Sequence, residues 1–105
     1  MALLPLLNAQ TGTTYTTVLT DAGKLITLSN AGAITLTVPP SSSVAYAIGT
    51  SIDMVQIGAG QVTVAGGVGV TVNATPGLKF RAQYSAATLL KIAANTWVLV
   101  GDLSA

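Results

Sequence analysis

Apolar residues alternate with threonine or other polar residues in short runs throughout this chain. The run "AITLTVPP" places Ile34, Leu36 and Val38 on one side and two threonines on the other. A period of two with β-branched residues is typical of strands that are buried on one face. Because helical periodicity is nearly absent, the sequence predicts an all-β fold.

Glycine, asparagine and proline separate these runs, and all three favour turns. About eight or nine short strands at this spacing are typical of an antiparallel β-sandwich or barrel-like domain. We therefore predict one such domain, with strands near 13–19, 24–29, 33–38, 51–57, 61–65, 68–72, 78–83, 87–93 and 96–100.

The first residues do not alternate with a nearby partner. We predict a short N-terminal arm over residues 1–12, followed by the β-domain over residues 13–105. The arm contains Leu3, Leu4, Leu6 and Leu7, which we predict to contact a partner. A leucine gains roughly 1.5–3 kcal/mol when it is fully buried, before the cost of ordering. In the alternative interpretation these leucines close the domain's own core, since small domains need their apolar residues.

Charged residues make up only 7% of the chain, and the net charge is +1. This charge is too small to attract a polyanion, so nucleic-acid binding has little support. Threonine occupies outward strand positions where lysine or glutamate would suit water better, which indicates burial between subunits. We therefore expect a homo-oligomer. No run has the uninterrupted length of a membrane span, so no membrane partner is expected.

The composition argues against catalysis. The chain has no histidine and no cysteine, which removes the commonest general base and the thiolate metal ligands. Serine and threonine are abundant, but no base is available to activate one. The glycines at 58–60 and 66–67 are not followed by the helix that a dinucleotide-binding loop requires, and they predict hairpin turns. We expect no enzyme activity, no cofactor and no metal.

Two aspartates are candidate functional residues. Asp21 lies in the turn sequence "TDAGK" and is predicted to cap a backbone turn. Asp53 interrupts the apolar strand "SIDMVQI". One interpretation is a carboxylate that binds a metal or a sugar. The favoured interpretation is a solvent-facing residue or an ion pair with Lys79, Arg81 or Lys91, because no second acid or ligand cluster accompanies it.

The aromatic residues allow a similar pair of interpretations. They are Tyr15, Tyr46, Phe80, Tyr84 and Trp97. Together they could form a platform on which a sugar stacks. The favoured interpretation places Trp97, in "NTWVLV", in the core or in a subunit interface, since a large ring contributes most when it is buried.

Several stretches resemble a β-rich module of virion proteins from tailed bacteriophages. The resemblance rests on a "TDxGK" turn, a strand ending in "VPP", a "GAGQVT" segment, a "YSAATL" segment and a "W-L-GDL" ending. These motifs lie at Asp21–Lys24, Val38–Pro40, Gly58–Thr63, Arg81–Leu90 and Trp97–Leu103, and the stretches that carry the resemblance span nearly the whole chain. The resemblance implies a structural role in the virion and no catalytic residues.

The short region ahead of the module favours a place on the capsid, because fibre proteins usually carry such modules behind a long shaft. A compact β-domain with a short arm resembles a capsid decoration (cement) protein, typically a trimer that clamps neighbouring capsid subunits. We therefore predict a homotrimer on the capsid surface that binds the major capsid protein. One alternative is a tail or tail-fibre module that binds a host surface glycan. Another is a β-module unrelated to phages, with a small-molecule pocket.

Overall fold

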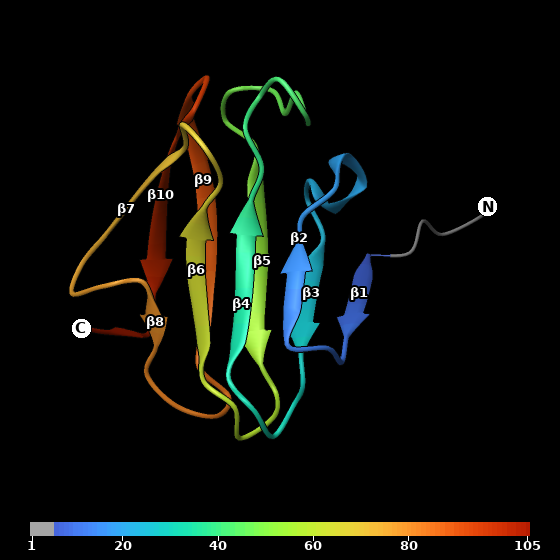
Figure 1. Cartoon of the computed structure of the whole chain (residues 1–105), viewed down its shortest axis with the longest axis vertical. Helices are drawn as coiled ribbons and strands as arrows, with labels where there is room; N and C mark the ends of the chain where they lie inside the picture. The colour runs from blue at the N-terminus through green and yellow to red at the C-terminus, as the bar shows by residue number, and fades with distance from the viewer. Residues whose placement is uncertain (1–5) are drawn as a thin grey trace.

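The computed structural model describes residues 6–105, which form two β-sheets packed face to face (Figure 1). The order of the six-stranded sheet is β1 (Leu7–Gln10), β3 (Leu25–Leu28), β5 (Ser51–Gln56), β9 (Ala86–Ala93), β10 (Thr96–Gly101) and β7 (Thr71–Ala74). The order of the five-stranded sheet is β11 (Leu103–Ser104), β8 (Lys79–Phe80), β6 (Val62–Gly66), β4 (Ile34–Val38) and β2 (Thr14–Thr16).

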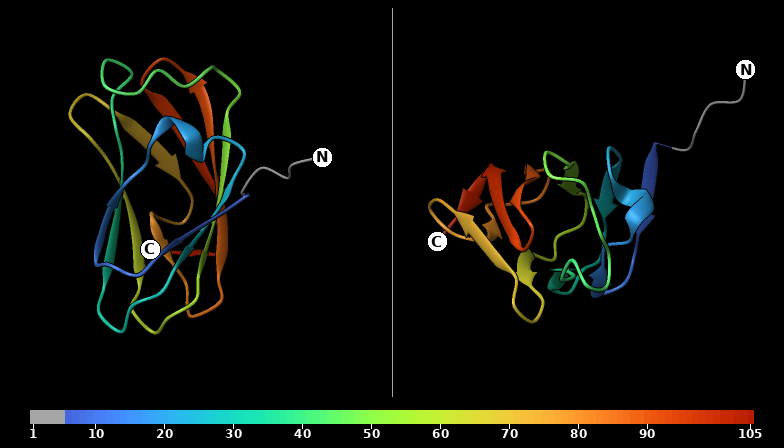
Figure 2. Two further views of the ribbon diagram at one scale, coloured as in Figure 1. Left: turned by 90° about the vertical axis from the view of Figure 1, so that its right-hand side faces the viewer. Right: turned by 90° about the horizontal axis from the view of Figure 1, so that it is seen from above.

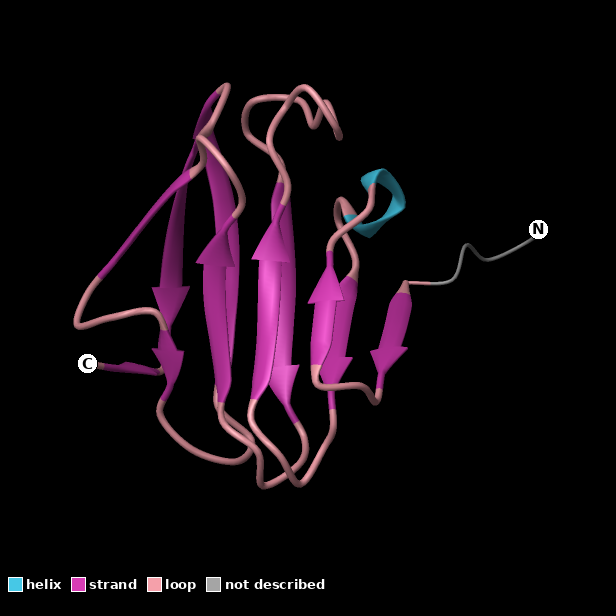
Figure 3. Cartoon of the chain, viewed as in Figure 1, coloured by secondary structure: helices cyan, strands magenta, loops and turns pink. Residues whose placement is uncertain are grey.

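A single turn of 3-10 helix, η1 (Leu19–Asp21), is the only helix within residues 6–105 (Figure 3). In this part of the chain, no helix is long and apolar enough to cross a membrane.

The chain passes from one sheet to the other after almost every strand. β1, β3 and β5 lie in the six-stranded sheet, whereas β2, β4 and β6, which follow them, lie in the five-stranded sheet. Each coil of two strands therefore stacks on the previous coil, and strands one coil apart pair in parallel. The result is a solenoid-like stack, whose two layers are visible from the side and from above in Figure 2.

The predicted all-β fold is confirmed, but the predicted antiparallel sandwich or barrel-like arrangement is wrong. Five strand pairs are parallel, and the antiparallel pairs all involve β8 or β9. The reason lies in the turns. The glycines at 58–60 and 66–67 do not fold the chain back as hairpins but lead it into the opposite sheet.

The nine predicted strands correspond in order to β2 through β10. The arm prediction is wrong for residues 7–10, because they form β1 and pair in parallel with β3. Their partner follows only after β2 and η1 along the chain, so alternation with a nearby strand does not reveal it. The two-residue strand β11 also lies outside the predicted strands.

The core lies between the sheets. Because side chains alternate between the two faces of a strand, the apolar positions of "ITLTV" in β4 are buried and its first threonine is exposed. The buried apolar residues are Ile26, Leu28, Ile34, Leu36, Val38, Tyr46, Ile52, Met54, Val62, Val64, Phe80, Ala87, Leu89, Trp97, Leu99 and Leu103.

The second and third coils form an internal repeat. The pairing of β3 with β5 and of β4 with β6 has one constant offset along the chain, which aligns "SNAGAITLTV" with "IGAGQVTVAG". At the corner between the sheets, a Cβ on Gly60 would lie 1.8 Å from the carbonyl oxygen of Gly32. Only glycine therefore allows the third coil to stack on the second.

Candidate interaction surfaces

The outward residues of the six-stranded sheet form a surface that we call the apolar face. Five large apolar side chains on it are between 36% and 56% exposed: Leu7, Leu25, Leu90, Ile92 and Val100. The strand pairing places Leu7 beside Leu25 and Val100 beside Thr88 in one row across the sheet. Asp53 and Thr88 lie between Leu25 and Val100 in this row. Exposed apolar residues gathered on one face of a sheet favour contact with another molecule.

Sequence reasoning missed most of this face, although a signal was present. The runs "TLLKIA" in β9 and "TWVLV" in β10 carry apolar residues at nearly every position, not at every second position. Such continuous runs are typical of strands covered on both faces. The core covers one face of these strands, and the other is open to a partner.

A shallow hollow of about 330 Å³ opens on the apolar face. It is lined by Leu25, Asp53, Met54, Ala86, Ala87, Thr88, Val100 and Gly101. The hollow exists because Ala86 and Gly101 fill little space. Gly101 has a φ of 147°, and a Cβ there would lie 2.5 Å from the carbonyl oxygen of Ala86, so a larger residue does not fit at this position.

Asp53 is the one outward-facing charged residue of this sheet within residues 6–105. It is exposed, and the hydroxyl group of Thr88 donates to its Oδ1 at 2.6 Å. The structure thus agrees with the solvent-facing interpretation of Asp53. It shows no ion pair between Asp53 and Lys79, Arg81 or Lys91.

The outward residues of the five-stranded sheet form a second surface, which we call the threonine face. Threonine predominates on it, and its residues include Thr14, Thr16, Thr35, Thr37, Thr63, Ala65, Lys79 and Ser104. Parallel pairing in register places Thr14 beside Thr35 and Thr35 beside Thr63, and Lys79 continues that row next to Thr63. Lys79 is exposed, whereas Phe80 beside it is buried in the core.

Most other charges are engaged within the chain. Arg81 and Asp102 form a two-pronged ion pair, with Nε–Oδ1 and Nη2–Oδ2 distances of 2.7 and 2.9 Å. The bonds from Arg81 and Ser85 lower the pKa of Asp102, and the same ion pair raises the pKa of Arg81. Asp21 and Lys91 are buried. The three remaining charges within residues 6–105 have no ion pair in this part of the chain: Lys24 lies half-buried on the turn before β3, and Asp53 and Lys79 lie exposed, one on each outer face.

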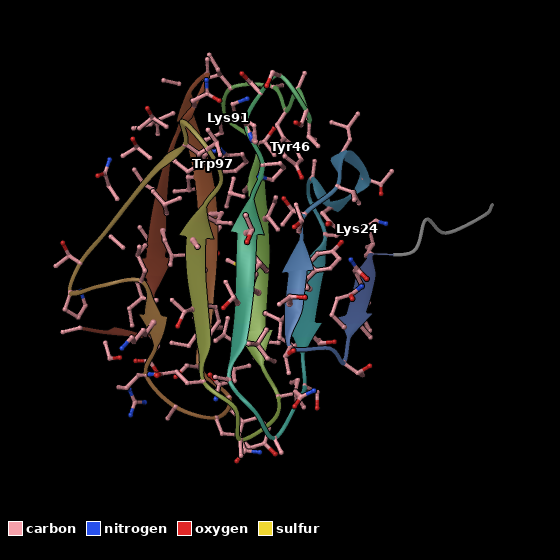
Figure 4. The ribbon with its side chains drawn as sticks, in the orientation of Figure 1. Lys24, Tyr46, Lys91 and Trp97 are labelled. Carbon is pink, nitrogen blue, oxygen red and sulfur yellow. The ribbon has the colours of Figure 1, made fainter. Side chains whose placement is uncertain are left out.

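Lys91 points into one end of the core, where Figure 4 shows it beside Tyr46 and Trp97. Its Nζ donates to the carbonyl oxygen of Tyr46 at 2.7 Å and lies 6.0 Å from the centroid of the Trp97 ring. The Tyr46 ring packs edge-on against Trp97, and its hydroxyl group donates to the carbonyl oxygen of Val18 at 2.6 Å. These contacts hold the 39–50 loop over the end of the core, so the cluster has a structural role.

Asp21 is buried in the first coil, where it accepts three hydrogen bonds. The donors are Nδ2 of Asn8 at 2.8 Å, the hydroxyl group of Tyr15 at 2.5 Å and the backbone N–H of Val18 at 3.0 Å. The bond from Val18 confirms the prediction that Asp21 caps a backbone turn. Burial, followed by the bond with Asp21, raises the pKa of Tyr15 to about 12. The cluster joins β1, β2 and η1.

The aromatic residues do not gather into a platform for a sugar. Phe80, Trp97 and Tyr46 are buried, and Tyr15 is half-buried. Tyr84 is 69% exposed on the turn that precedes β9. The structure agrees with the favoured interpretation of Trp97 as a core residue.

The predicted contact leucines have different outcomes. Leu3 and Leu4 lie outside the described residues. Leu6 and Leu7 are 68% and 56% exposed and do not belong to the core. They lie on the first coil, where the backbone N–H of Leu25 donates to the Leu6 carbonyl oxygen. The side chain of Asn8 joins η1 to the same coil through Asp21.

Two apolar residues at η1 are exposed as well, Val18 at 46% and Leu19 at 56%. We call the set of Leu6, Leu7, Val18 and Leu19 the first-coil surface. Leu7 also belongs to the apolar face.

Within residues 6–105, no three acidic, cysteine or histidine residues are placed to hold a metal ion. No protein-family model, curated protein or solved structure matches this chain.

Proposed function

We propose that this chain is a structural protein of a tailed-bacteriophage virion: a capsid decoration (cement) protein, trimeric on the capsid surface, that binds and stabilises the major capsid protein lattice. The observation that carries the proposal is the pair of broad outer faces, apolar and threonine-rich, with one exposed charge each. Such faces suit burial against other subunits. The resemblance to virion modules supports the same function.

The proposed mechanism is binding alone. The outward side chains are attached to hydrogen-bonded strands, so little conformational freedom remains to be lost when they dock. We assign the capsid contact to the first-coil surface, whose four apolar side chains are exposed without contributing to the core. In an oligomer, each copy adds one such contact, and the avidity multiplies their effect.

The contact is tested by co-sedimentation with phage heads that lack the decoration protein. We expect the double variant Leu6→Asp/Leu7→Asp to bind at least about tenfold more weakly, because two charges must then be desolvated at the contact. The matched control is Val68→Asp, which adds a charge at a 92% exposed apolar residue on the turn after β6. If both variants bound as tightly as the original chain, the capsid contact would lie on a surface other than the first-coil surface.

The location is tested by gold-labelled antibodies on intact virions. Labels on the head are expected. Labels confined to the tail would contradict the decoration proposal and favour the tail or tail-fibre module that binds a host glycan.

A further inference from the structure

We infer that the apolar face of one copy docks on the threonine face of a second copy, with the second copy's Lys79 inserted beside Asp53. This contact goes beyond the proposed function, since it specifies which surfaces meet and the register in which they meet. It does not depend on where in a virion the protein resides.

The first argument is charge complementarity. Within residues 6–105, the outward faces of the two sheets carry one charge each, Asp53 on the apolar face and Lys79 on the threonine face, and neither forms an ion pair in this part of the chain. A contact between unlike faces therefore brings opposite charges together. A contact between two apolar faces would instead enclose two carboxylates in one apolar interface, which is unfavourable without a cation.

The second argument is the shape of the surface around Asp53. The hollow of about 330 Å³ beside it has no bulky side chain at Ala86 and Gly101. Thr88 holds Oδ1 of Asp53 through a hydrogen bond of 2.6 Å, and no hydrogen bond to Oδ2 is seen within residues 6–105. A lysine side chain from outside can place its stem along the apolar lining and its ammonium group at this oxygen.

The third argument is area. The molecule measures 39 × 32 × 20 Å, and the outer sheet faces lie on its two broad sides (Figure 2). This footprint exceeds the roughly 800 Å² per partner that a stable interface needs. The methyl groups of the threonine face supply apolar contact to Leu25, Leu90 and Val100, while their hydroxyl groups remain able to bond with water or with the partner.

Because unlike faces meet, the contact is heterologous and repeats from copy to copy. The two faces lie on opposite broad sides of the molecule (Figure 2), so the repeat continues as an open row and does not by itself close the trimer of the proposed function. Every junction in the row contains the same Asp53–Lys79 contact.

The charge contact is tested by reversal and swap of the two residues. We expect Asp53→Lys and Lys79→Asp each to weaken self-association at least about tenfold, measured by sedimentation velocity over a range of concentrations. The double variant Asp53→Lys/Lys79→Asp should return to within about threefold of the original chain, because the pair is restored in reverse. Val68→Asp is the control, since it adds a negative charge at a 92% exposed residue on the turn after β6, outside both faces, and should have little effect.

Two results of this experiment would overturn the inference. One is a monomer at every concentration, which would mean that the faces bind a different protein. The other is an oligomer weakened by Asp53→Lys but indifferent to Lys79→Asp, which would mean that two apolar faces meet.

Cross-linking gives a readout that does not rely on charge. The chain has no cysteine, so Asp53→Cys and Lys79→Cys each introduce a single thiol at an exposed position. Under oxidation, a mixture of the two variants should form mainly the mixed disulfide, and neither variant alone should cross-link efficiently. Efficient cross-linking of Asp53→Cys by itself would contradict the inference.

These results are separable from those for the proposed function. Self-association through Asp53 and Lys79 without binding to heads would refute the decoration proposal and leave the inference standing. Binding to heads by a chain that does not self-associate would refute the inferred contact between copies and leave the decoration proposal standing.

Discussion

At the residue scale, the corner glycines decide how closely successive coils can stack. Gly32 and Gly60 occupy equivalent positions in the repeat, yet their surroundings differ. A Cβ on Gly32 would meet nothing closer than 3.5 Å, whereas one on Gly60 would meet a backbone carbonyl at 1.8 Å. The corner of the third coil lies directly against the backbone of the second. The corner of the second coil has more room, since the nearest atom of the first coil is the Thr13 methyl group at 3.9 Å.

We therefore expect Gly60→Ala to destabilise the protein by about 3 kcal/mol, because the backbone must shift to relieve the clash. Gly32→Ala, the matched control, should change the stability by less than about 1 kcal/mol. Chemical denaturation of both variants measures the difference. If the two variants were equally stable, the third coil would not be stacked on the second as closely as described.

At the element scale, a polar cluster joins β1, β2 and η1, whereas the second and third coils are joined mainly by apolar contacts. Tyr15 donates its hydroxyl proton to the buried Asp21, and its pKa is raised to about 12. The unfolded value is about 10. Because this pKa is higher in the folded state, the Tyr15–Asp21 hydrogen bond stabilises the folded protein fully below about pH 10. This stabilisation is lost as the pH rises through about 12.

We expect Tyr15→Phe to lower the stability at neutral pH by about 2 kcal/mol, because a charged, buried acceptor loses a donor. The difference from the original chain should stay constant up to about pH 10 and shrink as the pH approaches 12. Denaturation at several alkaline pH values measures this. Tyr84→Phe serves as the control, since no side-chain hydrogen bond from the exposed Tyr84 is seen within residues 6–105. A similar loss of stability in Tyr84→Phe would contradict the stabilising role of the Tyr15–Asp21 hydrogen bond.

At the scale of the whole molecule, the solenoid-like stack leaves the first coil at one end, where it is supported from one side only. Its strands β1 and β2 pair on one side only, with β3 and β4. The strands of the second and third coils, β3 to β6, each have a neighbouring strand on both sides in their sheet. In stacked repeats, stability is approximately a sum of contributions from neighbouring repeats, so the first coil should open at a lower free energy than the second and third coils.

Native-state hydrogen exchange tests this expectation. The amide groups of β1 and β2 that bond to β3 and β4 should exchange through a local opening of lower free energy than the amide groups of β5 and β6. Removal of residues 1–10 should lower the melting temperature, since it deletes β1 and the Asn8 donor to Asp21. Uniform protection across all the strands would show that the stack opens only as a unit.

The sequence by itself determined the strands and their buried sides. In "AITLTV" the alternation identifies Ile34, Leu36 and Val38 as core residues, because a strand places every second side chain on the same face. It also placed threonine on the outward side of β2, β4 and β6. The glycine and proline breaks located the turns, since these residues adopt or impose backbone angles that strands do not use.

Only the tertiary structure decided which strands pair and which surfaces remain open. A turn sequence such as "IGAGQ" is compatible both with a hairpin and with a corner between sheets, and the choice depends on whether the next strand packs across the core or beside its predecessor. Parallel pairing joins strands that are distant along the chain, so local alternation carries no record of it. For the same reason, the hollow beside Asp53 could not be foreseen. Its walls come from β3, β5, β9 and β10, and only their lateral order in the sheet brings Ala86 and Gly101 next to that carboxylate.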